Sequence, residues 1–370
     1  MKAVLSCGGT GGHIYPAIAI ADKIRERIPD AQILFIGTQK GMENTLVPKA
    51  GYDIKSIDSR GFDRKHVLSN YKTIQKYFEG SHEVAEILKE FGPDVCIGTG
   101  GYVTGPVISQ AHKQGIRCFL HEQNALPGLA NRFLSRFAEK VFASFDGTQD
   151  RFKHPDRVIV TGNPIRSGFM TMDRDECRRS LGIPDTDKMI LVFGGSLGAE
   201  TINRETLGLI DEMSVSGVKL YFVTGRRYFD RIKGEVEKKS SGFAKSDSLQ
   251  LLPYTDEMPR LMCASDVVIS RSGAIAVSEI AACGKPSILI PSPNVTDNHQ
   301  YYNAKAMADG GASVLLEEKD LPEGQNVLAK EVLRLLSEPE SLKGMAASAK
   351  AMSRINAADL IFENLGLNNE

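Results

Sequence analysis

Apolar residues along the chain follow two alternating patterns: short runs rich in β-branched residues, and longer stretches with apolar residues every three or four positions. The first run, residues 3–5, precedes a stretch with apolar residues at Ile14, Ala17, Ile18 and Ala21, the spacing of one helix face. Equivalent runs occur at residues 33–36, 95–97, 118–120, 140–143, 158–160, 190–193, 220–223, 249–252, 267–269, 287–290 and 313–315. Strands that alternate with helices predict parallel sheets covered by helices.

Glycines cluster where a strand is expected to end and a helix to begin, once in each half of the chain. Residues 8–13 read Gly-Gly-Thr-Gly-Gly-His, and residues 194–199 read Gly-Gly-Ser-Leu-Gly-Ala. A glycine loop at a helix start lets backbone N–H groups approach a phosphate closely. The repetition predicts an α/β protein of two Rossmann-like domains whose parallel sheets face a shared cleft.

The segment Thr-Gly-Asn-Pro at residues 161–164 is the expected boundary between these domains. It follows a predicted strand, and its proline disfavours helix at the residue before it. A length of 370 residues suits about two ordinary domains. We therefore predict a first domain over residues 1–163 and a second over 164–349. The C-terminal helix of about residues 350–370 is expected to pack back on the first domain.

Charge, cysteine content and hydropathy indicate which partners the chain can bind and in which compartment it works. The formal net charge is −1, so the chain has no overall attraction for nucleic acid, which we exclude as a partner. The six cysteines are scattered without a Cys-x-x-Cys pair, as is usual for reduced intracellular thiols. Because no apolar run reaches about 18 residues and a strand begins at once, we expect a protein without a membrane span or signal segment.

The two glycine loops do not fit the common nucleotide motifs. A dinucleotide-binding unit needs an acidic residue about 20 positions after its glycines, at the end of the second strand. Here the second strands end in Gly37-Thr38 and Thr224-Gly225, which argues against NAD or FAD. Neither cluster continues into Gly-Lys-Ser or Gly-Lys-Thr, which excludes a Walker loop.

An acidic residue stands instead on a later helix that Gly273 opens. Backbone N–H groups near Ala274 can meet a diphosphate there, while Glu279, in the second turn, can accept hydrogen bonds from both ribose hydroxyls. The alternative is that Glu279 is a solvated helix residue. Its apolar neighbours, Val277 and Ile280, weaken that alternative.

The ordered series of motifs resembles the glycosyltransferases of GT-B architecture, and most closely the bacterial N-acetylglucosaminyltransferases that complete lipid II. The similarity spans essentially the whole chain, at residues 8–13, 98–106 (GTGGYVTGP), 121–124 (HEQN), 162–166 (GNPIR), 194–199, 271–279 and 299–304 (HQYYNA). The resemblance implies inverting transfer of N-acetylglucosamine from UDP-N-acetylglucosamine to the 4-hydroxyl of the N-acetylmuramyl unit of lipid I. The product would be lipid II, an intermediate of peptidoglycan synthesis.

The resemblance also assigns a donor site. Arg166 and the backbone at Thr255 would hold the uracil, and Glu279 the ribose. The family usually has isoleucine at position 255, which matters little if only the main chain is used. Asn124 and Gln300 would reach the sugar hydroxyls, although Gln300 alone reads equally well as a surface amide. The remaining predicted donor contacts are Thr10, Gly11, Gly12, Ser196, Ala274, Ile275, Ala276, Val277 and Ser278.

His13 stands at the mouth of the first glycine loop and is our candidate general base. An imidazole has a pKa suited to accepting a proton near neutral pH, here from the attacking 4-hydroxyl. The alternative is a structural histidine that caps the helix. Glu122 is the next choice for the base, and His121 a lesser candidate for an acid–base role.

No cofactor and no protein-bound metal are predicted. The pattern Asp-x-Asp, which holds a metal in many sugar transferases, occurs at residues 173–175 and 185–187. Neither copy follows an apolar strand, so both read as helix-cap and turn acids. Helix N-termini and hydroxyl groups would stabilise the leaving diphosphate instead.

A polyprenyl-linked acceptor requires contact with a membrane. A helical stripe with neighbouring lysines suits the anionic inner leaflet and predicts a peripheral protein on the cytoplasmic face of the bacterial membrane, although such a stripe also occurs in protein cores. Its members are Tyr71, Lys72, Ile74, Lys76, Tyr77 and Phe78. We further expect the loop residues Gly100, Gly101, Tyr102 and Thr104 to hold the acceptor's diphosphate.

Two other functions remain open from the sequence. A UDP-N-acetylglucosamine 2-epimerase would share the architecture but would need several carboxylates in its cleft and no lipid surface. A non-catalytic sugar-nucleotide binder would bind the donor and have no acceptor. The loop that ends in His13 and the stripe at residues 71–78 favour the transferase.

Overall fold

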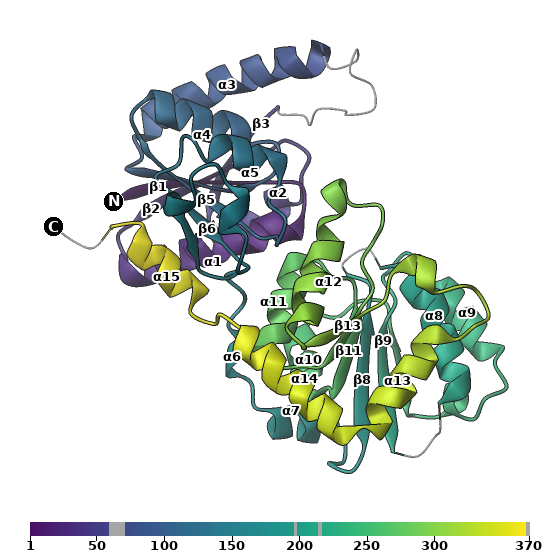
Figure 1. Ribbon diagram of the computed structural model, residues 1–370. Helices are drawn as coiled ribbons and strands as arrows, with labels where there is room; N and C mark the ends of the chain where they lie inside the picture. The colour runs from purple at the N-terminus through teal and green to yellow at the C-terminus, as the bar shows by residue number, and fades with distance from the viewer. Residues whose placement is uncertain (59–70, 196–197, 214–216, 368–370) are drawn as a thin grey trace. The chain divides into compact units, whose positions relative to one another are not determined.

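The computed structural model describes residues 1–58, 71–195, 198–213 and 217–367, with the backbone alone over residues 71–78. The chain forms two compact units (Figure 1). The first, called the N-unit, comprises residues 1–165 together with 354–370, and the second, the C-unit, comprises residues 166–353. The division lies between residues 165 and 166, two residues beyond the predicted boundary and just after the Thr-Gly-Asn-Pro segment.

Parallel strands form the centre of the N-unit. In its described residues the sheet has seven strands in the order β3-β2-β1-β4-β5-β6-β7. The first strand lies between the second and the fourth, with Val4 opposite both Leu34 and Cys96. The strands are β1 (Lys2–Cys7), β2 (Gln32–Thr38), β3 (Asp53–Ile57), β4 (Val95–Gly100), β5 (Arg117–Glu122), β6 (Lys140–Ala143) and β7 (Val158–Val160).

Helices cover both faces of this sheet. They are α1 (Gly11–Arg27), α2 (Glu43–Lys49), α3 (Tyr71–Phe91), α4 (Thr104–Lys113), α5 (Leu129–Leu134) and α15 (Ala357–Asn364), with short turns η2 (Gln149–Arg151) and η3 (Pro155–Arg157). Successive strand residues point to opposite faces, so Leu5 packs with α1 and α15 while Val4 packs with α3 and α4 (Figure 1). The C-terminal helix α15 contributes Ile361 and Phe362 to the N-unit core, and Leu365, directly after the helix, joins them.

The C-unit repeats this plan. Its described residues form a sheet of six parallel strands in the order β10-β9-β8-β11-β12-β13. The strands are β8 (Lys188–Phe193), β9 (Val218–Val223), β10 (Leu249–Leu252), β11 (Val267–Ser270), β12 (Ser287–Leu289) and β13 (Ser313–Leu315). On the central strand β8, Ile190 lies opposite Leu220 on one side and Val267 on the other.

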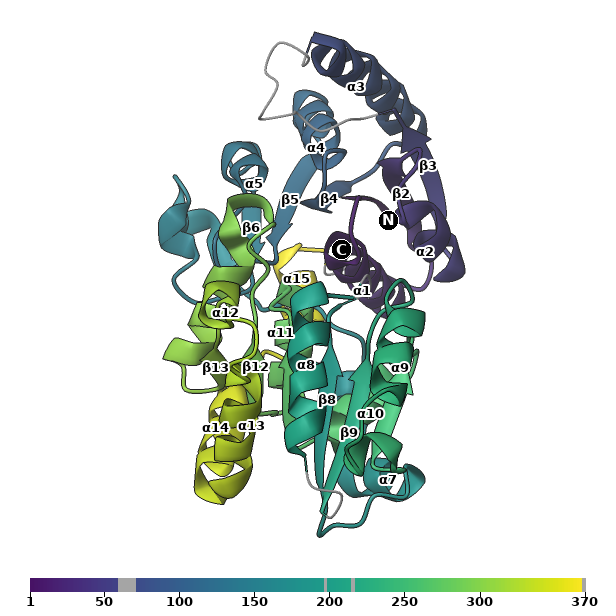
Figure 2. The same cartoon turned by 90° about the vertical axis from the view of Figure 1, so that its right-hand side faces the viewer.

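Apolar helix faces bury this second sheet. Buried residues of α8, α9 and α13 pack together against one face, and Figure 2 shows α8 lying across β8. The helices are α6 (Gly168–Thr171), α7 (Arg174–Ser180), α8 (Glu200–Glu212), α9 (Phe229–Glu237), α10 (Met258–Ala264), α11 (Ala274–Ala282), α12 (His299–Asp309), α13 (Val327–Ser337) and α14 (Pro339–Met352), with short turns η4 (Phe243–Lys245), η5 (Thr296–Asn298) and η6 (Glu318–Asp320).

The predicted fold class of two Rossmann-like α/β units is confirmed, and each predicted apolar run forms a strand. The strand β3 was missed because its side chains alternate between exposed and half-buried until Ile57. In the part of the chain that the structure describes, no helix is both long enough and apolar enough to span a bilayer.

Strand order determines where a ligand can bind in each unit. In each sheet the direction in which successive strands are added reverses after the third strand in sequence. The reversal lies between β1 and β4 in the N-unit and between β8 and β11 in the C-unit. Ligands of doubly wound α/β proteins bind at the carboxyl ends of strands at such a reversal. The glycine loops after β1 and β8, and the loops after β4 and β11, occupy those positions.

Candidate active site

The first glycine loop holds His13 through its own backbone. After β1 ends at Cys7, residues 8–10 turn into α1, and the Nδ1 atom of His13 lies 2.9 Å from the Gly8 carbonyl oxygen. Because a carbonyl only accepts, Nδ1 carries the proton and Nε2 of the neutral imidazole carries the lone pair. The loop therefore makes Nε2 the basic nitrogen of this side chain.

The loop after β4 packs against the same histidine. A Cβ atom on Gly100 would lie 2.6 Å from Cδ2 of His13, and one on Gly101 would lie 2.6 Å from the Gly8 carbonyl oxygen. Both glycines have positive φ, +116° and +88°. The Thr99 hydroxyl donates to the His13 carbonyl over 2.8 Å, which joins the two loops. Only glycine fits this close approach.

The residues predicted to hold the acceptor's diphosphate divide into two groups. The Thr104 hydroxyl donates to the Gly100 carbonyl over 2.9 Å and accepts the Gly100 N–H over 3.2 Å, and Thr104 is buried. These bonds close the loop on itself, so the structure argues against direct ligand contact by the Gly100 N–H or by Thr104. Gly101 packs against Gly8, whereas Tyr102 is 65% exposed.

Glu43 is a buried carboxylate at this site that the sequence analysis missed. It begins α2 and has no exposed surface. Its Oε2 accepts the Gly9 N–H over 3.2 Å, and its Oε1 accepts the N–H and the hydroxyl of Thr38 over 2.8 and 2.6 Å. An acidic residue at a helix start is ordinary in sequence, and the packing of Gly8, Gly37 and Gly41 against its side chain is what marks it in the structure.

His121 lies behind the site as a buried neutral histidine. Its Nε2 lies 3.3 Å from the Gly162 carbonyl, and its Nδ1 lies 2.9 Å from the Gln123 side-chain nitrogen, which assigns the proton to Nε2. Burial is the main cause that lowers the pKa of His121 to about 4; the hydrogen bond to the Gly162 carbonyl opposes it, and the nearby His13 adds a smaller lowering effect. The expectation of an acid–base role for His121 is therefore wrong on this geometry.

Glu122 positions its neighbours and does not suit the role of alternative base. One carboxylate oxygen accepts the backbone and side-chain N–H groups of Asn124 over 3.0 and 3.2 Å. The other accepts the Gly128 N–H over 3.0 Å and the Asn131 amide over 2.8 Å. Four donors surround this buried carboxylate, so Glu122 orients Asn124, a predicted sugar contact. Because its oxygens are already bonded, His13 is the better candidate for the base.

In the C-unit, two predicted donor residues meet although they lie 113 positions apart. Arg166 Nη2 lies 3.3 Å from Glu279 Oε1, and the Glu279 side chain is 10% exposed. The pKa of Glu279 is raised to about 7, because the effect of burial exceeds the opposing effect of the Arg166 charge and hydrogen bond. The family resemblance assigned these residues to the uracil and the ribose, which are adjacent parts of one nucleoside.

The start of α11 presents backbone donors beside this pair. Val277 N–H already bonds to the Gly273 carbonyl over 3.0 Å, and the Ser278 hydroxyl donates to the Ala274 carbonyl over 3.0 Å. Ala274 begins the helix, and the N–H groups of Ile275 and Ala276 lie in its first turn, where N–H groups have no intrahelical acceptor. This arrangement suits an anion at the helix N-terminus.

Other predicted donor residues have defined surroundings. Gln300 Oε1 accepts the Ser292 N–H over 2.9 Å, which leaves the amide nitrogen as the donor end of that side chain. The Thr255 hydroxyl accepts the Glu257 N–H over 3.0 Å, within a turn before α10. Ser196 lies outside the described residues. So do the side chains of the predicted membrane stripe, although its backbone forms the start of α3 as expected.

The two Asp-x-Asp segments have local structural roles. Asp173 accepts the Glu176 N–H over 2.9 Å and caps α7, as the sequence predicted. Asp185 lies 3.9 Å from Arg178 in the turn that follows. Within the described ranges, no three or more His, Cys, Asp or Glu side chains are grouped as metal ligands would be.

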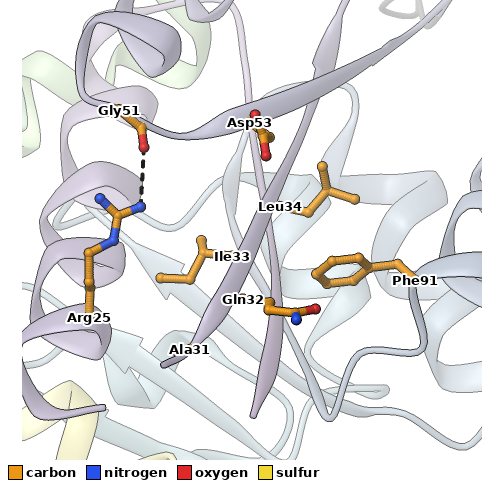
Figure 3. A pocket seen from close by; sticks show the side chains of 8 residues that line it. All are labelled: Arg25, Ala31, Gln32, Ile33, Leu34, Gly51, Asp53 and Phe91. Atoms are coloured by element: carbon orange, nitrogen blue, oxygen red, sulfur yellow. Dashed lines mark hydrogen bonds between the residues drawn. The ribbon is translucent and has the colours of Figure 1, made fainter. Parts of the chain in front are cut away.

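A cavity of about 320 Å³ lies at the amino ends of strands β2 and β3 of the N-unit sheet (Figure 3). It is lined by Gln32 and Asp53, where β2 and β3 begin, and by Arg25 and Phe91. Arg25 donates to the Gly51 carbonyl over 3.2 Å. Because this cavity is at the amino ends of the strands, it is separate from the glycine loops and His13.

Comparison with known proteins agrees with this geometry. The glycosyltransferase family 28 N-terminal domain matches residues 3–143, and the family's C-terminal domain matches residues 189–361. The chain belongs to glycosyltransferase family 28. The resemblance stated from the sequence and the predicted enzyme class, a glycosyltransferase, are thereby confirmed.

Relatives within family 28 span nearly the whole chain. A UDP-N-acetylglucosamine–N-acetylmuramyl-(pentapeptide) pyrophosphoryl-undecaprenol N-acetylglucosamine transferase of Acetivibrio thermocellus is 44% identical, covering 98% of this chain and 97% of the relative. The protein of the same name from Clostridioides difficile is 41% identical, covering 99% and 88%.

Solved structures show the same architecture. MurG of Acinetobacter baumannii matches with a TM-score of 0.79 at 25% identity, covering 99% of both chains. A UDP-GlcNAc 2-epimerase from Neisseria meningitidis, bound to UDP-GlcNAc, matches with a TM-score of 0.68 at 19% identity over the full length of both. At that identity the epimerase shows only that the two proteins share a fold.

Proposed function

We propose that this family 28 enzyme transfers N-acetylglucosamine from UDP-N-acetylglucosamine to the N-acetylmuramyl unit of lipid I, which gives lipid II. The observation that carries the proposal is the identity of 41–44% with transferases of that name over 98–99% of the chain. The same relatives favour the transferase over the epimerase and over a non-catalytic binder.

The C-unit supplies the groups that suit the donor. Glu279 can accept hydrogen bonds from the ribose hydroxyls, and Arg166, paired with it, lies where the uracil would follow. The N–H groups at the start of α11 suit the diphosphate. Gln300 would donate its amide to a sugar hydroxyl. Asn124 and the Thr10, Gly11 and Gly12 segment of the N-unit stay predicted donor contacts.

His13 would act as the general base. Its Nε2 takes the proton of the acceptor's 4-hydroxyl while that oxygen forms a bond to the anomeric carbon of the donor sugar. The bond from the anomeric carbon to the β-phosphate oxygen breaks on the opposite side, UDP departs with the electron pair, and the configuration inverts. The Gly8 carbonyl holds Nδ1–H of the resulting imidazolium.

The leaving diphosphate needs positive potential as its negative charge grows. We assign that role to the first-turn N–H groups of α11, without a protein-bound metal or other cofactor. A chelator should then leave the rate of transfer unchanged. A rate that falls with EDTA and returns with added Mg²⁺ would contradict this part of the proposal.

Contact with the anionic inner leaflet follows from a polyprenyl-linked acceptor. Besides the stripe at residues 71–78, the N-unit exposes Leu129 and Phe133, at 53% and 55%, on α5. The Arg136 guanidinium lies 3.5 Å from the centre of the Phe133 ring. Exposed apolar side chains with arginine beside them suit an anionic interface, so we propose a peripheral enzyme on the cytoplasmic face of the membrane.

One assay separates the candidate functions. Incubation with labelled UDP-N-acetylglucosamine and a lipid I analogue should give labelled disaccharide lipid. Formation of an epimer, or binding without turnover, would refute the transferase.

His13→Ala tests the base within the same assay. We expect turnover to fall about 10²- to 10⁴-fold, because a positioned base contributes that much, while affinity for UDP stays unchanged. Near-normal turnover of the variant would remove His13 from the mechanism.

A further inference from the structure

The buried carboxylate of Glu43 is connected to His13 by a single peptide group. Gly8 and Gly9 are joined by one peptide bond, whose carbonyl oxygen belongs to Gly8 and whose N–H belongs to Gly9. The N–H donates to Glu43 over 3.2 Å, and the carbonyl accepts His13 Nδ1–H over 2.9 Å. The carboxylate, the peptide and the imidazole therefore form one hydrogen-bonded chain.

We propose that Glu43 is a positioning residue for the base, which stabilises the imidazolium of His13 through the Gly8–Gly9 peptide. This inference rests on the proposed function, because it concerns the histidine that we assign as base. It goes further by including a residue of a different helix, α2, whose carboxylate reaches the imidazole through a peptide group.

Hydrogen-bond polarisation is the physical reason. A carboxylate that accepts a peptide N–H draws the proton toward itself and leaves the carbonyl oxygen at the other end more negative. That oxygen then accepts the Nδ1–H of an imidazolium more strongly than that of a neutral ring. A carboxylate bound directly to Nδ1–H has the same effect in hydrolase triads, and here a peptide group lies between.

The surroundings of Glu43 keep this chain in place. Both of its oxygens accept, and the Thr38 N–H and hydroxyl hold Oε1 at the end of β2. On the other side of the loop, Gly101 packs against the Gly8 peptide. A peptide fixed from both sides keeps its hydrogen bonds as the charge on the imidazole changes.

Within the residues that the structure describes, the hydrogen bonds and protonation of the titratable groups His121, Cys7 and Glu122 direct them away from the Gly8–Gly9 peptide. His121 on β5 is neutral because burial lowers its pKa to about 4. Burial and the charge of Glu43 raise the pKa of the Cys7 thiol, on β1, so that it stays protonated. Glu122 on β5 is already bound by four donors from residues 124–131. Among the residues described, Glu43 is therefore the charge placed to act on this peptide.

Glu43→Gln tests the proposal in a way that does not depend on turnover. In ¹⁵N NMR of the imidazole, the pKa of His13 should fall in the variant by at least about 0.5 unit, roughly threefold in proton affinity. Glu205→Gln is the matched control, because Glu205 is a buried glutamate of the C-unit paired with Arg204. An unchanged His13 pKa in folded Glu43→Gln would overturn the proposal.

A double-mutant cycle with His13→Ala separates a role through His13 from general loosening of the loop. Glu43→Gln should lower kcat about threefold or more, in step with the loss of proton affinity, with little change in KM for the donor, and should move the acid limb of the pH–rate profile to lower pH. In the His13→Ala background the same substitution should change the residual rate less than twofold. An equal loss in both backgrounds would refute the relay.

Two outcomes keep this test independent of folding and of the proposed function. If Glu43→Gln does not fold, wild-type NMR still decides, because the relay requires a neutral His13 with the proton on Nδ1, and an Nε2–H tautomer would overturn it. If the wild-type enzyme does not glycosylate lipid I, the proposed function fails while the NMR comparison still tests the relay.

Discussion

Replacing the buried Glu279 by glutamine should stabilise the protein at alkaline pH and not at acidic pH. The pKa of Glu279 is raised from 4.5 to about 7, because burial penalises the carboxylate and Arg166 offsets only part of that penalty. The difference of about 2.5 pH units corresponds to about 3 kcal/mol at ~1.36 kcal/mol per unit. The side chain is 10% exposed, so solvent screens little of this free energy.

The sign follows from proton binding. Between pH 4.5 and about 7 the folded protein holds more protons at Glu279 than the unfolded chain, so the free energy of unfolding decreases as pH rises. The contribution is fully present below pH 4.5 and fully lost above pH 7. Glutamine has the shape of the protonated acid and does not titrate, so the variant should gain up to about 3 kcal/mol over wild type at pH 8 and almost nothing at pH 4.5.

Urea unfolding at pH 4.5 and pH 8, followed by far-UV circular dichroism because the chain has no Trp, measures this difference. The C-unit transition is the relevant one if the two units unfold separately. Glu340→Gln is the control, because Glu340 is 86% exposed and its effect should not change between these pH values. A Glu279→Gln effect of the same size at both pH values would refute the reasoning.

The same substitution should weaken donor binding. The carboxylate has two acceptor oxygens for the ribose hydroxyls and the amide has one, so affinity for UDP should fall about tenfold, as the loss of a charged hydrogen bond predicts. Calorimetric titration with UDP at pH 8 measures it. A protein that becomes more stable while it binds less tightly would show that the buried charge is retained for function.

Three further substitutions test other parts of the structure. Gly100→Ala, at φ +116° with a Cβ 2.6 Å from the His13 ring, should lower kcat more than tenfold and cost about 1–3 kcal/mol of stability, measured by turnover and unfolding. Arg178→Ala should cost about 3–5 kcal/mol in urea unfolding, because it removes a fully buried guanidinium that donates to Asp266 and to the carbonyls of Ala264, Pro184 and Asp187. Phe133→Glu should reduce co-sedimentation with anionic vesicles severalfold, while turnover of a soluble acceptor analogue stays unchanged.

Each of these three has an outcome that would contradict it. Wild-type kcat in Gly100→Ala would mean that the ring of His13 can shift without consequence. A loss under about 1 kcal/mol for Arg178→Ala would show that water or repacking satisfies the buried groups. Vesicle binding that survives Phe133→Glu would place the membrane contact elsewhere, with the stripe at residues 71–78 as the first alternative.

The sequence alone determined the architecture and the position of the candidate site. Apolar runs of three or four residues between helical patterns predicted strands such as 190–193, because the burial of an element is reflected in the spacing of its own apolar residues. Glycines at strand ends located the loops that carry His13 and Ala274. Strand β3 escaped this reasoning because half of its side chains face solvent.

Only the tertiary structure decided how the polar groups are used. It paired Arg166 with Glu279, committed Thr104 to its own loop, made His121 neutral and brought Glu43 to the Gly8–Gly9 peptide. A hydrogen bond depends on two groups meeting at about 3 Å, often from distant parts of the chain, and on whether water is excluded around them. Hydrophobic periodicity records which face of an element is buried, and it carries no information about which donor meets which acceptor.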